Sequence, residues 1–129
     1  MRLALACASL LALTVGAGAA QAQTAPEVAF NIGVVSDYVF RGASQTDEEP
    51  ALQGGVDVSF ASGFYVGGWA SMVDFGDDTD AEVDLYGGYR TELGGYGLDL
   101  GVVSYLYVNE PGSADYNYVE LKAAASRAI

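Results

Sequence analysis

Carboxylate side chains are concentrated in the stretch DFGDDTDAEVD, which runs from Asp74 to Asp84. Calcium prefers several carboxylate oxygens at once, so this stretch is the first candidate for a metal site. The spacing does not fit the EF-hand loop, because no glycine follows the run from Asp78 to Glu82 and Tyr89 stands where that loop has its bidentate glutamate. A solvated acidic loop is the better interpretation, and no metal site is predicted.

Nucleophilic catalysis would need a serine, threonine or cysteine with a base beside it. The chain has no histidine, and its one cysteine, Cys7, lies in an apolar run near the N-terminus. Without histidine, the serines cannot form a common catalytic triad. Glu82 and Asp84 alternate along one predicted strand, but acids at this spacing are expected on any polar sheet face. The sequence therefore predicts neither an enzyme nor a bound cofactor.

The polar side chains occur in stretches where apolar and polar residues alternate, which is the pattern of a β-strand with two different faces. The first stretch runs from Val28 to Arg41 and the second from Leu52 to Phe60. The third, from Phe64 to Val73, is ambiguous, because either of its faces could be the apolar one. Further strands are expected over residues 82–90, over residues 98–108 and from Tyr116 onward.

Long acidic connections alternate with short glycine turns between these strands. The long connections are ASQTDEEP, DFGDDTDA and NEPGSAD, and the short ones are ASG and TELGG. In an up-and-down sheet this alternation puts the long loops at one end and the tight turns at the other. Several strands are long enough to cross a bilayer at a tilt, which takes about 9–11 residues. Aromatic residues flank both strand ends, as in the girdles of membrane barrels.

These features predict an all-β fold: an antiparallel up-and-down outer-membrane β-barrel, of which about six strands are present. A closed barrel satisfies its backbone hydrogen bonds inside lipid, with apolar side chains outward and polar side chains inward. The residues predicted to face the lumen are Asp37, Arg41, Asp57, Glu82, Asp84, Arg90 and Asp99. The predicted acidic mouth at the long-loop end comprises Asp47, Glu48, Glu49, Asp74, Asp77, Asp78 and Asp80.

The N-terminal segment has the composition of a secretory signal peptide. A basic start is followed by an apolar run from Leu3 to Val15 and by the small-residue site Ala20-Gln21-Ala22. The run is too short for a spanning helix, which needs about 20 residues. We therefore expect a signal peptide over residues 1–22 and a β-barrel domain over residues 23–129. That domain has no cysteine and a net charge of −13, because Arg2 is the only charged residue before it.

The quoted loops and strands also resemble a known family. The elements SDYVFRGASQT, GFYVGGW and EVDLYGGY are similar in combination to the TorF-like porins of proteobacteria, outer-membrane proteins of uncharacterised function, and the resemblance covers residues 31–120. It implies an exported outer-membrane barrel that acts as a passive pore, and it supplies no catalytic residue. Members of that family continue through further hairpins, whereas this chain stops after AAASRAI. A truncated or frameshifted reading frame is expected; the alternative is a complete chain that closes by association.

The predicted function is passive diffusion of small solutes through the outer membrane of a Gram-negative bacterium, with a weak preference for cations near the acidic mouth. Two alternatives stay open: a non-conducting structural barrel, and a secreted soluble β-barrel that binds a small apolar ligand. The expected partners are outer-membrane lipid, the barrel assembly machinery and small solutes or cations, with an oligomer as a further option. Nucleic acid is excluded as a partner, because phosphate contacts need clustered Lys and Arg.

Overall fold

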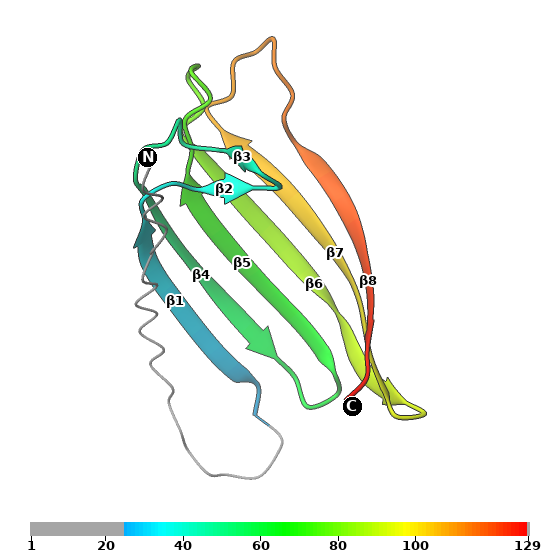
Figure 1. Cartoon of the computed structure of the whole chain (residues 1–129). Coiled ribbons are helices and arrows are strands. Elements are labelled where there is room, and N and C mark those ends of the chain that lie inside the picture. Colours follow the sequence, from blue (N-terminus) through cyan, green and yellow to red (C-terminus); the bar gives the residue numbers. More distant parts are fainter. Residues whose placement is uncertain (1–24, 129) are drawn as a thin grey trace, which may run out of the picture.

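The computed structural model describes residues 25–128, so the expected signal peptide at residues 1–22 lies outside the described residues. The described chain is all-β and antiparallel (Figure 1). Six strands form one sheet in the order β1-β4-β5-β6-β7-β8, and each pairs with the next. The strands are β1 (Glu27–Val35), β4 (Ala51–Ser59), β5 (Phe64–Met72), β6 (Ala81–Leu93), β7 (Tyr96–Val108) and β8 (Tyr118–Ser126). A separate hairpin consists of β2 (Val39–Phe40) and β3 (Ala43–Ser44).

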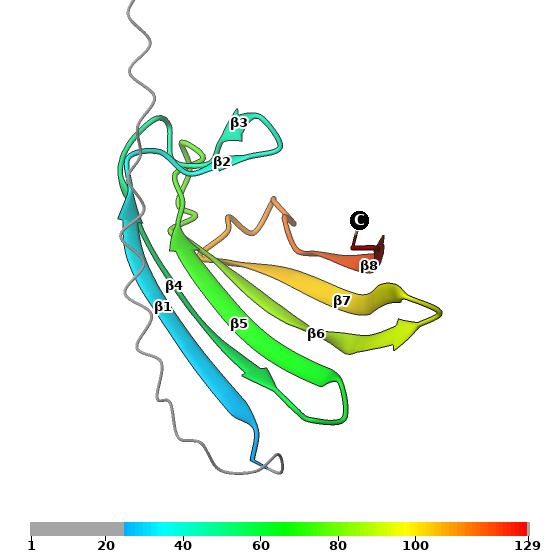
Figure 2. The same ribbon diagram turned by 60° about the horizontal axis from the view of Figure 1, so that its bottom comes forward.

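The six strands bend into a trough that is open along one side (Figure 2). Strands β1 and β8 form the two edges, and they do not pair with each other within residues 25–128. The described sheet is therefore not closed into a barrel. Among the same residues no helix is both long and apolar enough to span a membrane.

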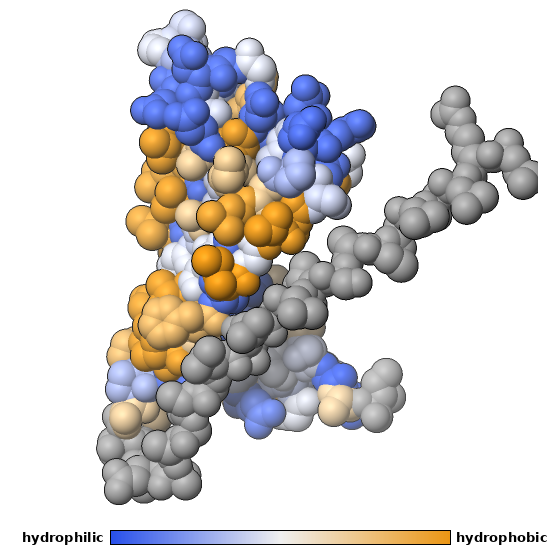
Figure 3. All heavy atoms as spheres, turned by 90° about the vertical axis from the view of Figure 1, so that its left-hand side faces the viewer, coloured by the Kyte–Doolittle hydropathy of each residue, from blue (hydrophilic) through white to orange (hydrophobic). Residues whose placement is uncertain are grey.

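The two faces of the sheet differ sharply in chemistry, because strand pairing keeps the alternation of each strand in step with its neighbours. Val56 is paired with Gly68, Gly68 with Leu85, and Leu85 with Ser104, all on the apolar face. This face is open to solvent: the exposed fraction is 53% for Leu85 and 88% for Leu121. Figure 3 shows apolar side chains over the strands on the β1 side of the molecule and hydrophilic ones at the loop end.

Pairing also settles the ambiguous third strand. Phe64, Val66 and Met72 of β5 lie exposed on the apolar face, whereas Tyr65 and Ser71 are buried on the opposite, polar face. Tyr65 is held there because its hydroxyl donates a hydrogen bond to Asp99 of β7 at 2.6 Å. The apolar face of the third strand is therefore the one that includes Phe64.

The first strand is shorter than expected, so the prediction of one strand from Val28 to Arg41 is wrong. Strand β1 ends at Val35, and the chain then forms the β2–β3 hairpin. Arg41 and Gly42 at its tip have φ angles of 51° and 84°. Positive φ at both central residues is the geometry that suits the twist of a two-residue hairpin. The residues after Val35 leave the sheet instead of continuing its apolar face.

All three long connections lie at one end of the sheet, and the two tight turns lie at the other (Figure 1). The tight turn between β6 and β7 consists of Gly94 and Gly95, with φ angles of 59° and 79°. The turn between β4 and β5 needs a glycine at position 63, where φ is 101°. A side chain at this position would also collide with the carbonyl oxygen of Arg90. The Arg90 N–H donates a hydrogen bond to the Gly63 carbonyl, which holds the turn against β6.

Candidate functional site

The polar face of the sheet, on the inside of the trough, carries the enclosed charged side chains. Glu82 is only 2% exposed and Asp84 only 9%, and the hydroxyl-bearing Ser71 is 2% exposed. In a soluble domain, side chains with so little exposure are usually aliphatic. Charged groups are almost never fully buried there unless they are paired. The enclosed part of this molecule is therefore polar, and its apolar part is exposed.

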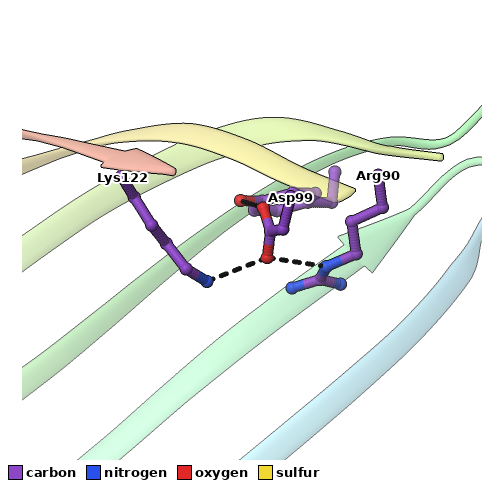
Figure 4. A network of polar contacts seen from close by, with 4 residues as sticks. Arg90, Asp99 and Lys122 are labelled. Atoms are coloured by element: carbon purple, nitrogen blue, oxygen red, sulfur yellow. Dashed lines mark hydrogen bonds and ion pairs between the residues drawn. The ribbon is translucent and has the colours of Figure 1, made fainter. Parts of the chain in front are cut away.

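Asp99 of β7 is the centre of a polar network near the turn end of this face. Figure 4 shows Arg90 and Lys122 reaching its carboxylate from either side. Lys122 Nζ lies 2.8 Å and Arg90 Nε lies 3.2 Å from Asp99 Oδ2, and the Tyr65 hydroxyl donates to Oδ1 at 2.6 Å. The Arg90 guanidinium also stacks over the Tyr65 ring at 4.0 Å from its centroid. The network thus joins β5, β6, β7 and β8.

Replacing Asp99 by alanine is expected to destabilise the fold by about 2–3 kcal/mol. The two cations are about half exposed, so their ion pairs contribute little. Most of the loss comes from the enclosed Tyr65 hydroxyl, which is left without its acceptor. The matched control is Glu92→Ala, which removes an exposed acid of β6 and is expected to change stability by less than about 0.5 kcal/mol. Urea unfolding of the refolded protein measures both, and equal midpoints would contradict the role of Asp99.

Two tyrosines reach aspartates two strands away by passing over a glycine. Tyr86 of β6 donates to Asp57 of β4 at 2.6 Å, and the residue between them in register is Gly67. A side chain at position 67 would overlap the Tyr86 ring. Tyr65 of β5 likewise crosses β6 at Gly88 to reach Asp99 of β7. A Cβ at position 88 would overlap the Tyr65 hydroxyl. The strand glycines of the polar face therefore make room for tyrosine rings that lie flat along the sheet.

The β2–β3 hairpin folds over the loop end of the polar face. The Tyr38 hydroxyl donates to Glu82 Oε1 at 2.8 Å, and the Tyr38 ring contacts Trp69 edge-on with the centroids 5.4 Å apart. At the hairpin tip, Arg41 Nη2 lies 2.6 Å from Glu120 Oε1 of β8. Burial, together with the bond to Glu82, raises the pKa of the Tyr38 hydroxyl, so this group stays a donor. The hairpin thus spans the trough between β6 and β8.

Five of the expected lumen-facing residues stand on strands of the polar face, and Arg41 lies over this face through its contact with Glu120. Asp57, Glu82, Asp84, Arg90 and Asp99 stand on the strands β4, β6 and β7. Asp37 and Arg41 belong to the segment that leaves the sheet. Asp37 serves the hairpin itself, because its Oδ1 accepts hydrogen bonds from Ser44 and Thr46 at 2.6 and 3.1 Å.

The residues of the expected acidic mouth lie in two neighbouring loops at the same end of the sheet and are exposed. They are Asp47, Glu48 and Glu49 before β4, and Asp74, Asp77, Asp78 and Asp80 between β5 and β6. The two loops are joined where the Asp74 N–H donates to the Gln45 carbonyl at 2.8 Å. Hydrogen bonds from Thr79 and from the Tyr116 hydroxyl hold the pKa of Asp77 below its usual range. Asp77 is thus part of the loop architecture as well as of the negative surface.

Sequence reasoning missed the aromatic partners of these charges. The predicted strand from Val28 to Arg41 puts Tyr38 in step with Phe30 on its apolar face, whereas Tyr38 lies over the polar face. Tyr65 and Tyr86 lie within predicted strands, but the alternation indicates no partner for either hydroxyl. The available signal was the repeated pairing of a tyrosine with a glycine on the neighbouring strand, which becomes visible only when the register is known.

Fold and site together define a class: an antiparallel β-meander with an enclosed polar face and an exposed apolar face. The chain belongs to a bacterial family of unknown function, Gcw_chp, whose model matches residues 19–129. No curated protein and no solved structure matches the chain. The resemblance to TorF-like porins therefore stays a prediction.

Proposed function

We propose that the chain forms the wall of an outer-membrane β-barrel that lets small solutes diffuse passively, with a weak preference for cations. The observation that carries the proposal is the distribution of side chains: Leu85 and Leu121 are exposed to solvent, while Glu82 is buried. Burying apolar surface is the dominant favourable term in folding, and here that surface is left uncovered. A lipid environment would cover it, and a water-filled interior would solvate the polar face.

Strand length and backbone pairing support the same proposal. Strands of 9 to 13 residues make up the sheet, which suits a bilayer crossed at a tilt by about 9–11 residues. The edges β1 and β8 still need partners, because unpaired backbone groups are excluded from hydrocarbon. Association of copies or additional strands would supply them. Lipid and the barrel assembly machinery are accordingly the proposed partners, and the outer membrane is the proposed location.

A non-conducting structural barrel is the second candidate, and a specific observation favours it. The Arg41–Glu120 pair and the Asp99 network, together with the hairpin, occupy the polar face. Small barrels filled by their own side chains conduct nothing. The third option, a soluble barrel around an apolar ligand, would need the apolar face inside, which is the reverse of the arrangement seen here.

Membrane association is tested by fractionation of cells that express the chain. We expect the protein to pellet with outer membranes, to resist carbonate extraction and to migrate differently on gels before and after heating. Recovery in the soluble fraction, with no heat-dependent migration, would overturn the proposal.

Ion selectivity is tested with the purified protein in planar bilayers under a salt gradient. The acidic loops concentrate cations within about 8–10 Å of the mouth, so a modest cation-selective reversal potential is expected. The preference should weaken as salt rises, because screening shortens that range. An anion-selective reversal potential would contradict the assigned role of the loops.

A further inference from the structure

Glu82 and Asp84 form a buried carboxylate pair on the polar face of β6. The two residues are next but one to each other on the strand, so their side chains project from the same face. They are 2% and 9% exposed. Asp84 Oδ1 is buried without a hydrogen-bond partner among the described residues. A buried charge without compensation is costly, so Asp84 must either take up a proton or pair with a cation.

The basic side chains of the described chain are all engaged elsewhere. Arg41 bonds to Glu120, and Arg90 and Lys122 both bond to Asp99. Arg127 reaches the Tyr96 hydroxyl at the turn end. Within residues 25–128 the pair therefore has no protein cation beside it.

The surroundings of the pair are oxygen-bearing and enclosed. In register, Glu82 lies between Ser71 of β5 and Tyr107 of β7, and Asp84 lies between Trp69 and Tyr105. The Tyr38 hydroxyl closes the site from above through its bond to Glu82 Oε1. Hard cations such as calcium take carboxylate and hydroxyl oxygens, and two carboxylates balance the charge of one divalent ion.

We propose that Glu82 and Asp84 bind one divalent cation of the calcium type beneath the β2–β3 hairpin. This site lies at the C-terminal end of the acidic stretch, where the chain is a buried strand. The exposed loop before it keeps its interpretation as a solvated segment. The described residues gather no group of three or more acidic, cysteine or histidine ligands, so hydroxyls and water complete the shell. The expected dissociation constant is therefore in the range of about 0.1–1 mM, as in weak extracellular calcium modules.

Trp69 provides a local reporter, because it is the only tryptophan of the chain and pairs directly with Asp84. The refolded protein in detergent micelles is titrated with calcium chloride at neutral pH while tryptophan emission and heat release are recorded. A saturable response with half-saturation near 0.1–1 mM is expected. The variant Asp84→Asn keeps the size of the side chain but removes one carboxylate ligand. Its affinity for calcium should fall by about tenfold or more.

Asp57→Asn is the matched control, because Asp57 is an acid of the same face that has its own partner in Tyr86. It should bind calcium as the natural protein does. The proposal is overturned if calcium up to about 10 mM leaves tryptophan emission unchanged, because protons would then neutralise the pair. It is also overturned if both variants lose calcium binding equally. Far-UV circular dichroism of each variant confirms that it is folded.

The cation site deepens the proposed cation preference. It rests on the proposed function in one respect, because the polar face must meet water for the ion to enter. Titration in micelles and carbonate extraction from cells are independent measurements. Calcium binding by a protein that does not pellet with membranes would overturn the proposed location alone, and a membrane-resident protein without binding would overturn the cation site alone.

Discussion

Arginine in place of Leu85 will prevent the chain from becoming a carbonate-resistant membrane protein. Leu85 lies at the centre of the apolar face, paired with Gly68 on one side and Ser104 on the other, and is 53% exposed. If this face meets lipid, position 85 lies near the middle of the bilayer. An arginine there costs about 2–4 kcal/mol, which is a large part of the stability of a small domain.

The matched control is the same substitution at Leu93, at the turn end of β6. This leucine is also exposed, but it pairs with Tyr96 beside the Gly94-Gly95 turn. Near the membrane interface the cost of arginine falls to about 0–1 kcal/mol, because the side chain reaches water. We therefore expect Leu93→Arg to insert almost normally. Carbonate-resistant protein, quantified against total expression, measures the difference between the two variants.

A soluble protein would behave in the opposite way. An exposed leucine on a water-facing surface tolerates arginine within about 0.5 kcal/mol, and solubility improves. Equal membrane recovery of the two variants would therefore remove the main support for a lipid-facing sheet.

Alternation along the chain is enough to predict the faces of β4, β6 and β7, because a period of two allows only two assignments for each strand. It is not enough for β5. Phe64 and Val66 on one face compete with Tyr65 and Trp69 on the other, and all four are typical strand residues. Its pairing with β4 and β6 decides between them, and the hydrogen bond from Tyr65 to Asp99 across β6 holds Tyr65 on the polar face.

The two ends of the sheet could not be predicted from local pattern. The alternation predicts one strand through the hairpin because Tyr38 and Phe40 continue it, and the positive φ angles of Arg41 and Gly42 that form the turn are visible only in the structure. Strand β8 runs to Ser126 through three alanines that are poor strand formers and show no alternation. It is a strand because β7 offers it a ladder, with Ala123 opposite Leu100 and Ala125 opposite Leu98. Tertiary pairing overrides local preference at both places.

Most of the predicted site could be placed from the alternation, but its interactions could not. The sequence indicates that Asp57, Asp84 and Asp99 share a face, and the structure places them on one. It does not indicate that Tyr86 passes over Gly67 to Asp57, since that contact depends on the register of three strands. The hairpin over this face is likewise a long-range feature, fixed by Tyr38 and Glu82, which are 44 residues apart.

Removing the hairpin is expected to open the loop end of the polar face. In this variant residues 39–44 are replaced by a Gly-Ser turn between Tyr38 and Gln45, whose backbones are already hydrogen-bonded at 2.6 Å. The change deletes the Arg41 contact to Glu120 and the Phe40 ring that lies against Tyr105. The tip of the hairpin then no longer crosses from β6 to β8.

Single-channel recording in planar bilayers measures the result. Conductance grows with the open cross-section, so the variant should conduct more than the natural protein. The control removes residues 111–114 from the long loop before β8 at the same end, a segment with an internal hydrogen bond from the Ala114 N–H to the Pro111 carbonyl. This control should leave conductance unchanged.

The possible outcomes separate the two candidate functions. A rise confined to the hairpin variant identifies the hairpin as the constriction of a pore. If instead neither the natural protein nor the hairpin variant conducts, while both remain carbonate-resistant, the interior is filled by its own side chains and the structural barrel is the correct assignment. Equal, measurable conductance of all three proteins would show that the hairpin does not narrow the interior, because opening a true constriction must change the current.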